Sequence, residues 1–294
     1  MTSISSLANT NSSSQTKLQT DALKILQNAL KTEKFFVKVH AAEFLIAQGF
    51  KDEPRAIFEE ELKNHESEKP YRIGIWRVLA RSAKTPVEKE KWISKLRDAF
   101  MDRVGEDRSH ALESLGKLNY KVSAKGDEEI ENYARSHSGV ERVLAEWVLA
   151  LSGKADYEKA LLKSCQMEDS EGRSFAAYGL RFLPNVSGEM RRQFLKLAVA
   201  EKEDSKAKIY FDGTALWLVK KSEQAKFRNN LWMALKQGTP KEKYEAGTAL
   251  AGRPDKQDVP HLIPLLAEDN ADARISAANA ILFAIKFHRP DKNP

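Results

Sequence analysis

The chain has 294 residues, of which 41% are hydrophobic and 31% charged, as expected for a soluble folded protein with a large exposed surface. No stretch approaches the roughly 18 apolar residues of a membrane-spanning helix. The only cysteine, Cys165, excludes an intramolecular disulfide and a cysteine-based metal site. The net charge of +6 is modest for a dedicated nucleic-acid binder.

Residues 1–20 are rich in Ser, Thr and Asn and lack the basic start and apolar core of a signal peptide. They are predicted to form a disordered polar leader, and residues 289–294 are predicted to form a C-terminal tail. These features favour a cytoplasmic protein. The alternative is an exported protein whose signal peptide is absent from this sequence, because similar polar stretches often follow a removed signal peptide.

Between the leader and the tail, the sequence predicts eight pairs of helices and no strand. The first helix of each pair is expected to begin at a good N-cap or at a proline suited to the first turn. These starts lie near Asp21, Pro54, Pro86, Asp127, Asp156, Ser187, Ser222 and Asp258. Helix breakers such as Gly49, Gly153 and Gly252-Arg253-Pro254 separate the helices.

The second helix of each pair carries a repeated pattern. A basic residue recurs at intervals of 31 to 36 residues: Lys38, Arg72, Arg108, Arg142, Arg173, Lys243 and Arg274, with Ile209 as the one exception. Three places later the residue is usually small: Ala41, Ile75, Ala111, Ala145, Ala176, Asp212, Ala246 and Ala277. Seven places later it is always aliphatic: Leu45, Leu79, Leu115, Leu149, Leu180, Leu216, Leu250 and Ile281. These offsets share one helix face, which must be buried by stacking on neighbouring repeats.

The last repeat resembles a known family. Its first helix reads Val259-Pro260-His261-Leu262-Ile263-Pro264-Leu265-Leu266, and its second begins Asp272-Ala273-Arg274 and continues Ala277-Ala278-Asn279-Ala280-Ile281. This pattern is similar to a HEAT repeat, and the other seven repeats match it more loosely. The resemblance implies an all-α, right-handed α-α superhelix (a HEAT-like, armadillo-like solenoid) as a single domain over residues 21–288. It also implies that partners bind on the concave face formed by the second helices, and that an Asp between the helices pairs with the basic column.

The exposed columns of the first three repeats are polar. His40 and Glu43 recur as His110 and Glu113, with Arg77 between them. A His and a Glu three residues apart can bind a metal or transfer protons, and an Arg suits an anion. However, repeats one and three are expected to lie roughly 20 Å apart, too far to share one metal. A solvated polar face, a recognition groove and a metal or catalytic site all remain open.

The middle repeats are aromatic in the same columns, two, five and nine places after the basic residue, with Trp147, Tyr178 and Phe182, and Trp217 lies next to them. Core packing is one explanation, and an apolar strip on the concave wall is the other. The sixth repeat breaks the pattern, because Asp212 replaces the small residue. With Trp217 and Arg181, Asp212 loosely resembles the cleft of HEAT-like DNA glycosylases. The alternative is a structural role, in which Asp212 caps a shifted helix or pairs with a neighbouring Lys or Arg.

The sequence therefore predicts a non-enzymatic scaffold that binds a protein partner or an adjacent domain along its concave face, with no cofactor. Two alternatives are kept. One is a small-ligand, metal or enzymatic site at the His/Glu/Arg cluster of the first three repeats, and the other is a DNA-binding protein of the glycosylase type. The expected binding residues are His40, Glu43, Arg77, His110, Glu113, Trp147, Tyr178, Arg181, Asp212 and Trp217.

Overall fold

The computed structural model describes residues 12–122 and 124–286, and this part of the chain is all-α, with helices and no strand. The first helices of the eight repeats are α1 (Ser12–Thr32), α3 (Asp52–His65), α5 (Pro86–Met101), α7 (Ala124–Ser136), α9 (Ala155–Ser164), α11 (Gly188–Ala200), α13 (Ala225–Gln237) and α15 (Val259–Leu262). The second helices are α2 (Phe35–Ala47), α4 (Tyr71–Ser82), α6 (Arg108–Lys117), α8 (Gly139–Leu151), α10 (Ser170–Arg181), α12 (Lys208–Leu218), α14 (Pro240–Ala251) and α16 (Ala271–Lys286). None of these helices combines the length and apolarity needed to cross a membrane.

The repeated columns explain how the second helices pack. Every residue of the aliphatic column, from Leu45 to Ile281, is buried, and so is every residue of the small column, from Ala41 to Ala277. Short side chains let neighbouring helices approach closely, and the aliphatic side chain fills the space between them. The pattern found in the sequence is therefore the contact surface between repeats, and the predicted fold class is confirmed.

The first helix begins earlier than the sequence suggested. Helix α1 starts at Ser12, so residues 12–20 are helical rather than part of a disordered leader. Leu18 lies four residues before the buried Ala22, which in turn precedes the buried Leu26 and Leu30. This spacing extends one apolar face of the helix toward the N-terminus. Residues 1–11 of the predicted leader and the predicted tail, 289–294, lie outside the described residues.

The last repeat departs from the predicted pair of continuous helices. Its first segment is divided into α15 and a 3-10 helix, η4 (Ile263–Ala267). Pro264 lies at the start of η4. A proline inside a helix has no N–H to donate and its ring clashes with the carbonyl of the residue four places earlier, so the α-helix ends before it.

The chain divides into two compact units. One comprises Met1–Gly49 and Trp232–Pro294 and is called the terminal unit below, and the other comprises Phe50–Leu231 and is called the central unit. The sequence predicted a single solenoid over 21–288. That one continuous solenoid spans both units stays a prediction.

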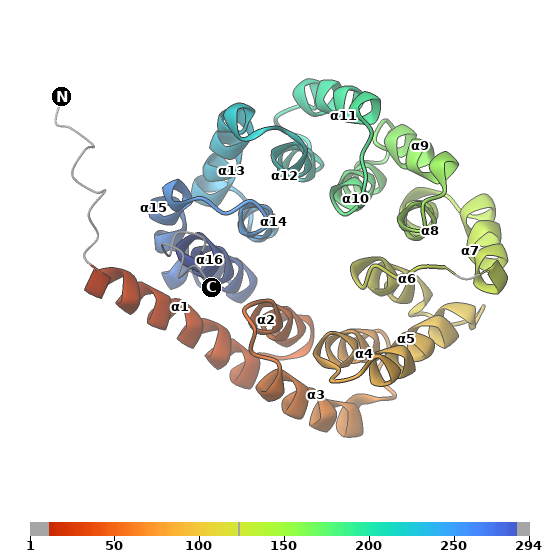
Figure 1. The fold of residues 1–294 in the computed structure, drawn as a ribbon, viewed down its shortest axis with the longest axis horizontal. Helices are drawn as coiled ribbons and strands as arrows, with labels where there is room; N and C mark the ends of the chain where they lie inside the picture. The colour runs from red at the N-terminus through yellow and green to blue at the C-terminus, as the bar shows by residue number, and fades with distance from the viewer. Residues whose placement is uncertain (1–11, 123, 287–294) are drawn as a thin grey trace, which may run out of the picture. The chain divides into compact units, whose positions relative to one another are not determined.

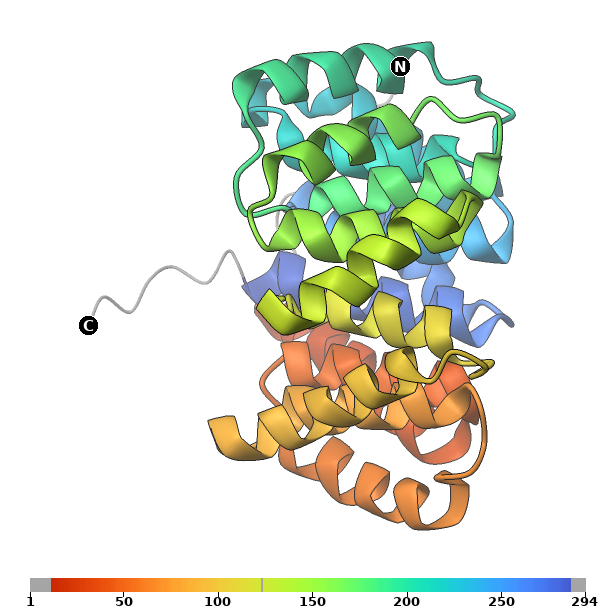
Figure 2. The ribbon, with the colours of Figure 1, turned by 90° about the vertical axis from the view of Figure 1, so that its right-hand side faces the viewer.

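In the central unit, successive second helices pack on one another from α4 to α12, and most first helices pack on the second helix of the same repeat. Figure 1 shows these two layers, with the second helices on the inner side of the curve that the central unit describes. In Figure 2 the first helices from α5 (gold) to α11 (green) are stacked in chain order. From α4 to α10, each second helix of the central unit thus packs on the second helix of the next repeat.

In the terminal unit, helices from the two ends of the chain pack together. Helix α1 packs on both α2 and α16, and α2 also packs on α16, which in turn packs on α14. Figure 1 shows α1 (red) beside α16 (dark blue). The first repeat is therefore a neighbour of the last one, although more than two hundred residues separate them along the chain.

Candidate functional site

His40 and Glu43 lie on α2 in the terminal unit. The His40 Nδ1 atom is 2.8 Å from Oδ1 of Asp272 on α16, and its ring lies 5.0 Å from the ring of Tyr244 on α14. Glu43 is half-buried. The interpretation as a solvated face with bonds inside one helix is thus wrong for His40, because its partners come from the last two repeats.

Arg77, His110 and Glu113 lie on α4 and α6 of the central unit. Arg77 is buried and donates a hydrogen bond to the Ser114 hydroxyl at 2.9 Å. Glu113 forms an ion pair of 2.8 Å with Lys117 one turn later. Burial raises the pKa of Glu113, but the positive charges of Lys117 and Arg77 outweigh it, so the pKa lies below its ordinary value. Arg77 thus stabilises the contact between α4 and α6 of two consecutive repeats.

The metal interpretation needs several ligands in one place. Among the described residues, no group of three His, Cys, Asp or Glu side chains is arranged to hold a metal ion. His40 belongs to the terminal unit and His110 to the central unit. The two His/Glu pairs therefore have different surroundings: His40 faces a carboxylate and a Tyr ring, and Glu113 faces a Lys.

Trp147 is a core residue of the central unit rather than part of a surface strip. Its side chain is almost fully buried. A Cβ added at Gly116 on α6 would lie 2.7 Å from its ring, and one added at Gly179 on α10 would lie 3.0 Å away. The glycines on both neighbouring helices thus make room for the indole, which explains why three successive second helices can pack around so large a side chain.

A second group of aromatic residues reaches the surface. Phe182 follows α10 directly and is 37% exposed. Its ring lies 4.8 Å from that of Tyr178 and 5.6 Å from that of Trp217, and both of these side chains are half-buried. The guanidinium of Arg181 lies 5.3 Å from the Tyr178 ring and 5.8 Å from the Trp217 ring. We call Tyr178, Arg181, Phe182 and Trp217 the aromatic–arginine cluster.

The cluster brings together three of the predicted binding residues and adds one that was not in the predicted set. Phe182 lies nine places after Arg173 in the repeat, a column predicted to point away from the core. Arg181 itself is buried and its Nε donates to the Thr214 hydroxyl at 3.3 Å. Its guanidinium contacts the rings of Tyr178 and Trp217 by cation–π interaction, and its hydrogen bond to Thr214 links α10 to α12.

Asp212 is buried at the start of α12 in the central unit. Its Oδ1 is 3.2 Å from Nζ of Lys208, and its Oδ2 accepts a hydrogen bond of 3.2 Å from Asn230 on α13. Burial raises the pKa of Asp212 to about 6, although Lys208 and Asn230 act in the opposite direction. The Lys208 contact lies within α12 and the Asn230 contact joins α12 to α13, which fits the structural interpretation of an Asp paired with a neighbouring Lys.

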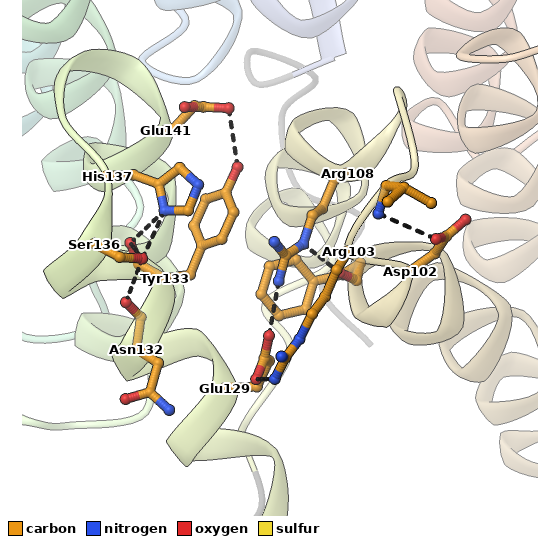
Figure 3. Close-up of polar contacts among 11 residues, drawn as sticks. Asp102, Arg103, Arg108, Glu129, Asn132, Tyr133, Ser136, His137 and Glu141 are labelled. Atoms are coloured by element: carbon orange, nitrogen blue, oxygen red, sulfur yellow. Dashed lines mark hydrogen bonds and ion pairs between the residues drawn. The ribbon is translucent and has the colours of Figure 1, made fainter.

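The basic column connects several repeats to the next one through ion pairs. The guanidinium of Arg108 lies 4.7 Å from the centre of the Phe100 ring and 4.4 Å from that of the Tyr133 ring. It also donates a hydrogen bond of 2.9 Å to Glu129 on α7, as Figure 3 shows. Tyr133 in turn donates to Glu141 at 3.0 Å. The resemblance implied an Asp partner for this column, and Arg72 does pair with Asp107 at 2.6 Å. Elsewhere the partner is a Glu, as with Arg173 and Glu201 at 3.0 Å.

No protein-family model and no curated protein matches the chain. Among solved structures, a crystal structure of an engineered protein from the Northeast Structural Genomics Consortium is 17% identical, covers 93% of this chain and 85% of that chain, and has a TM-score of 0.35. A second engineered protein from the same consortium is 15% identical, covers 91% of this chain and 97% of that chain, and has a TM-score of 0.24. The chain's own helix order and buried columns show that it is an all-α helical repeat protein.

Proposed function

We propose that this protein is a non-enzymatic, HEAT-like interaction module that binds a segment of a protein partner on the aromatic–arginine cluster. One observation carries the proposal, namely the 37% exposure of Phe182 beside the half-buried rings of Tyr178 and Trp217. Large apolar side chains that stay exposed on a rigid element are typical anchors for partners, and interfaces are enriched in Trp, Tyr, Phe and Arg.

The surroundings of the cluster favour an ordered recognition surface. The Phe182 ring also lies 6.0 Å from the buried Trp147 ring, so the exposed part of the cluster is continuous with the core of the central unit. Side chains held in this way lose little conformational entropy when a partner binds. A partner segment would therefore gain apolar contact with the rings without first having to order them.

The charge around the cluster favours an acidic partner. Lys220 and Lys221 are exposed and follow the end of α12, close along the chain to Trp217. The whole chain has a net charge of +6. We therefore infer that the bound segment carries an apolar or aromatic anchor for the rings, next to one or more Asp or Glu residues for the lysines.

A random-peptide display selection on the purified full-length protein tests this function without a known partner. Selected peptides are expected to share an apolar or aromatic residue next to Asp or Glu. Their affinity, measured by fluorescence anisotropy, is expected to fall roughly ten-fold or more in Phe182→Ala, because a central anchor is lost. Reversal of charge in Lys220→Glu should weaken binding less, and mainly at low salt.

Phe50→Ala is the matched control, because Phe50 is an aromatic residue of the same unit with a similar exposure of 43%. Circular dichroism should show that both variants keep the helical content of the parent. Peptides that bind Phe182→Ala as well as they bind the parent protein, or a selection without any shared anchor, would show that the cluster is not a binding site.

A further inference from the structure

The terminal unit contains an interface between the two ends of the chain. On one side is the N-terminal hairpin, which we define as residues 12–48, with helices α1 and α2. On the other side is α16. Two hydrogen bonds anchor the end of the hairpin: the Gln48 side chain donates to Asn279 at 2.9 Å, and Lys286 donates to the Gln48 carbonyl at 2.9 Å. Gln48 and Asn279 are both buried.

Elsewhere in the chain, one contact recurs between several pairs of consecutive repeats. The basic residue near the start of a second helix pairs with a carboxylate in the segment that joins the two helices of the following repeat, as Arg72 does with Asp107. Lys243 pairs in this way with Glu268 at 2.6 Å, and Arg173 with Glu201 at 3.0 Å. Arg108 instead pairs with Glu129 on α7. Where it occurs, the recurring ion pair joins the second helix of one repeat to the following repeat along the chain.

The last repeat follows the same rule, but its partner is the first repeat. Arg274 on α16 lies 3.5 Å from Glu33, which stands in the turn between α1 and α2. His40 and Asp272 add a second polar contact at 2.8 Å between the same repeats. The N-terminal hairpin therefore occupies the place of a ninth repeat after α16, with surfaces that complement the end of the stack.

The hairpin is tied to the rest of the chain by a short exposed connection. Gly49, Phe50 and Lys51 join it to α3, and all three are exposed. Gly49 has a φ of +98°, a left-handed conformation that glycine adopts at little cost. The boundary between the two compact units also falls between Gly49 and Phe50.

We propose that the N-terminal hairpin is an exchangeable element whose partner is a second copy of this chain. In the exchanged dimer, the hairpin of each copy packs on α16 of the other, through the same contacts that it makes within one chain. A hairpin that leaves its own α16 exposes an apolar face that it cannot bury alone, so it pairs again with any available α16. Within one chain the effective concentration is high, so exchange requires concentrated protein or simultaneous refolding.

A pair of complementary variants tests the proposal. One chain carries Glu33→Arg and His40→Asp, which place like charges opposite Arg274 and Asp272. The other chain carries Asp272→Lys and Arg274→Glu, which oppose His40 and Glu33. In each chain alone the ends repel, whereas in an exchanged pair both interfaces have matched partners: one is the native set and the other has both charges reversed.

The two chains, with different affinity tags, are unfolded together and refolded at high concentration. Their masses are then measured by light scattering after size exclusion. The proposal predicts a species of about 66 kDa, twice the 33.2 kDa of one chain, that contains both tags and exceeds either homodimer roughly ten-fold. A mixture that shows only the species formed by each chain separately would overturn the proposal.

A second pair of variants does not depend on how well the charge variants fold. Gly49→Ala strains the connection at its φ of +98°, and Gly153→Ala strains the equivalent turn after α8 at a φ of +82°. Neither added Cβ meets another atom within 4 Å, so the two changes are matched in packing. Gly49→Ala should raise the dimer fraction several-fold, and Gly153→Ala should leave it unchanged. Equal dimer fractions in the two variants would contradict the exchange of the hairpin.

Discussion

At the scale of single residues, Asp212 shows what burial does to an acid placed between helices. It occupies a column where six other repeats carry alanine, and its neighbours Lys208 and Asn230 supply hydrogen bonds that an alanine would not need. Burial nevertheless raises its pKa to about 6 from an ordinary value of 3.8. Because the folded state favours the protonated acid, the stability contributed by this group is full below pH 3.8 and is lost as the pH rises through about 6.

Asp212→Asn should therefore stabilise the protein most at neutral pH. The amide oxygen still accepts from Lys208, the amide nitrogen donates to the side-chain oxygen of Asn230 once that amide turns over, and no charge is buried at this position. We expect the free energy of unfolding, relative to the parent, to increase between pH 4 and pH 7.5 by up to about 3 kcal/mol, the equivalent of the change in pKa. Urea denaturation at several pH values measures this. The exposed Asp204→Asn is the control, and a difference between Asp212→Asn and the parent that does not vary with pH would contradict the explanation.

At the scale of the helices, the basic column holds neighbouring repeats in register. Arg72 near the start of α4 pairs with Asp107, the residue before α6, and the Asp107 side chain is completely buried. Such a carboxylate depends on its cationic partner, because a buried charge left alone is costly. Surface pairs such as Lys63 and Glu60 on α3 have no such dependence, since water solvates both groups.

Arg72→Ala should consequently destabilise the protein by about 2 kcal/mol, a value reduced from that of a fully buried pair because Arg72 itself is partly exposed. Lys63→Ala, which removes a surface cation of the adjacent helix, should cause no measurable change. Both variants are compared by thermal and urea denaturation. If the two variants were equally stable, the column would not hold the repeats together.

The positions of the helices could largely be predicted from the sequence, whereas the exposure of individual side chains could not. The aliphatic column predicted all eight second helices, because a buried face requires the same residue type in every repeat. The break at Pro264 was missed because the resemblance to a HEAT repeat outweighed the local effect of proline. The sequence also did not predict which aromatic side chains are exposed. Trp147 was in the predicted site, but two facing glycines admit it into the core, whereas Phe182 was not in the predicted site and is 37% exposed.

At the scale of the whole molecule, the main feature that the sequence did not reveal is the contact between its two ends. The spacing of repeats describes neighbours along the chain and contains no information about residues 232 positions apart. The sequence therefore placed His40 in a polar face of the first repeats without any link to Asp272, although the two side chains lie 2.8 Å apart. A stack of repeats normally needs special terminal repeats with polar outer faces, whereas here the first and last repeats cover each other in the terminal unit.

This contact between the first and last repeats is tested most directly by hydrogen exchange measured on Ala278→Asp. Ala278 is fully buried on α16, and a charge there should separate α16 from its neighbours. We predict that the backbone amides of α1 and α2 lose protection together with those of α14 and α16, while those of α8 and α10 in the central unit keep theirs. If α1 and α2 retained the protection of the parent protein while α14 and α16 lost it, the first repeat would not pack on the last.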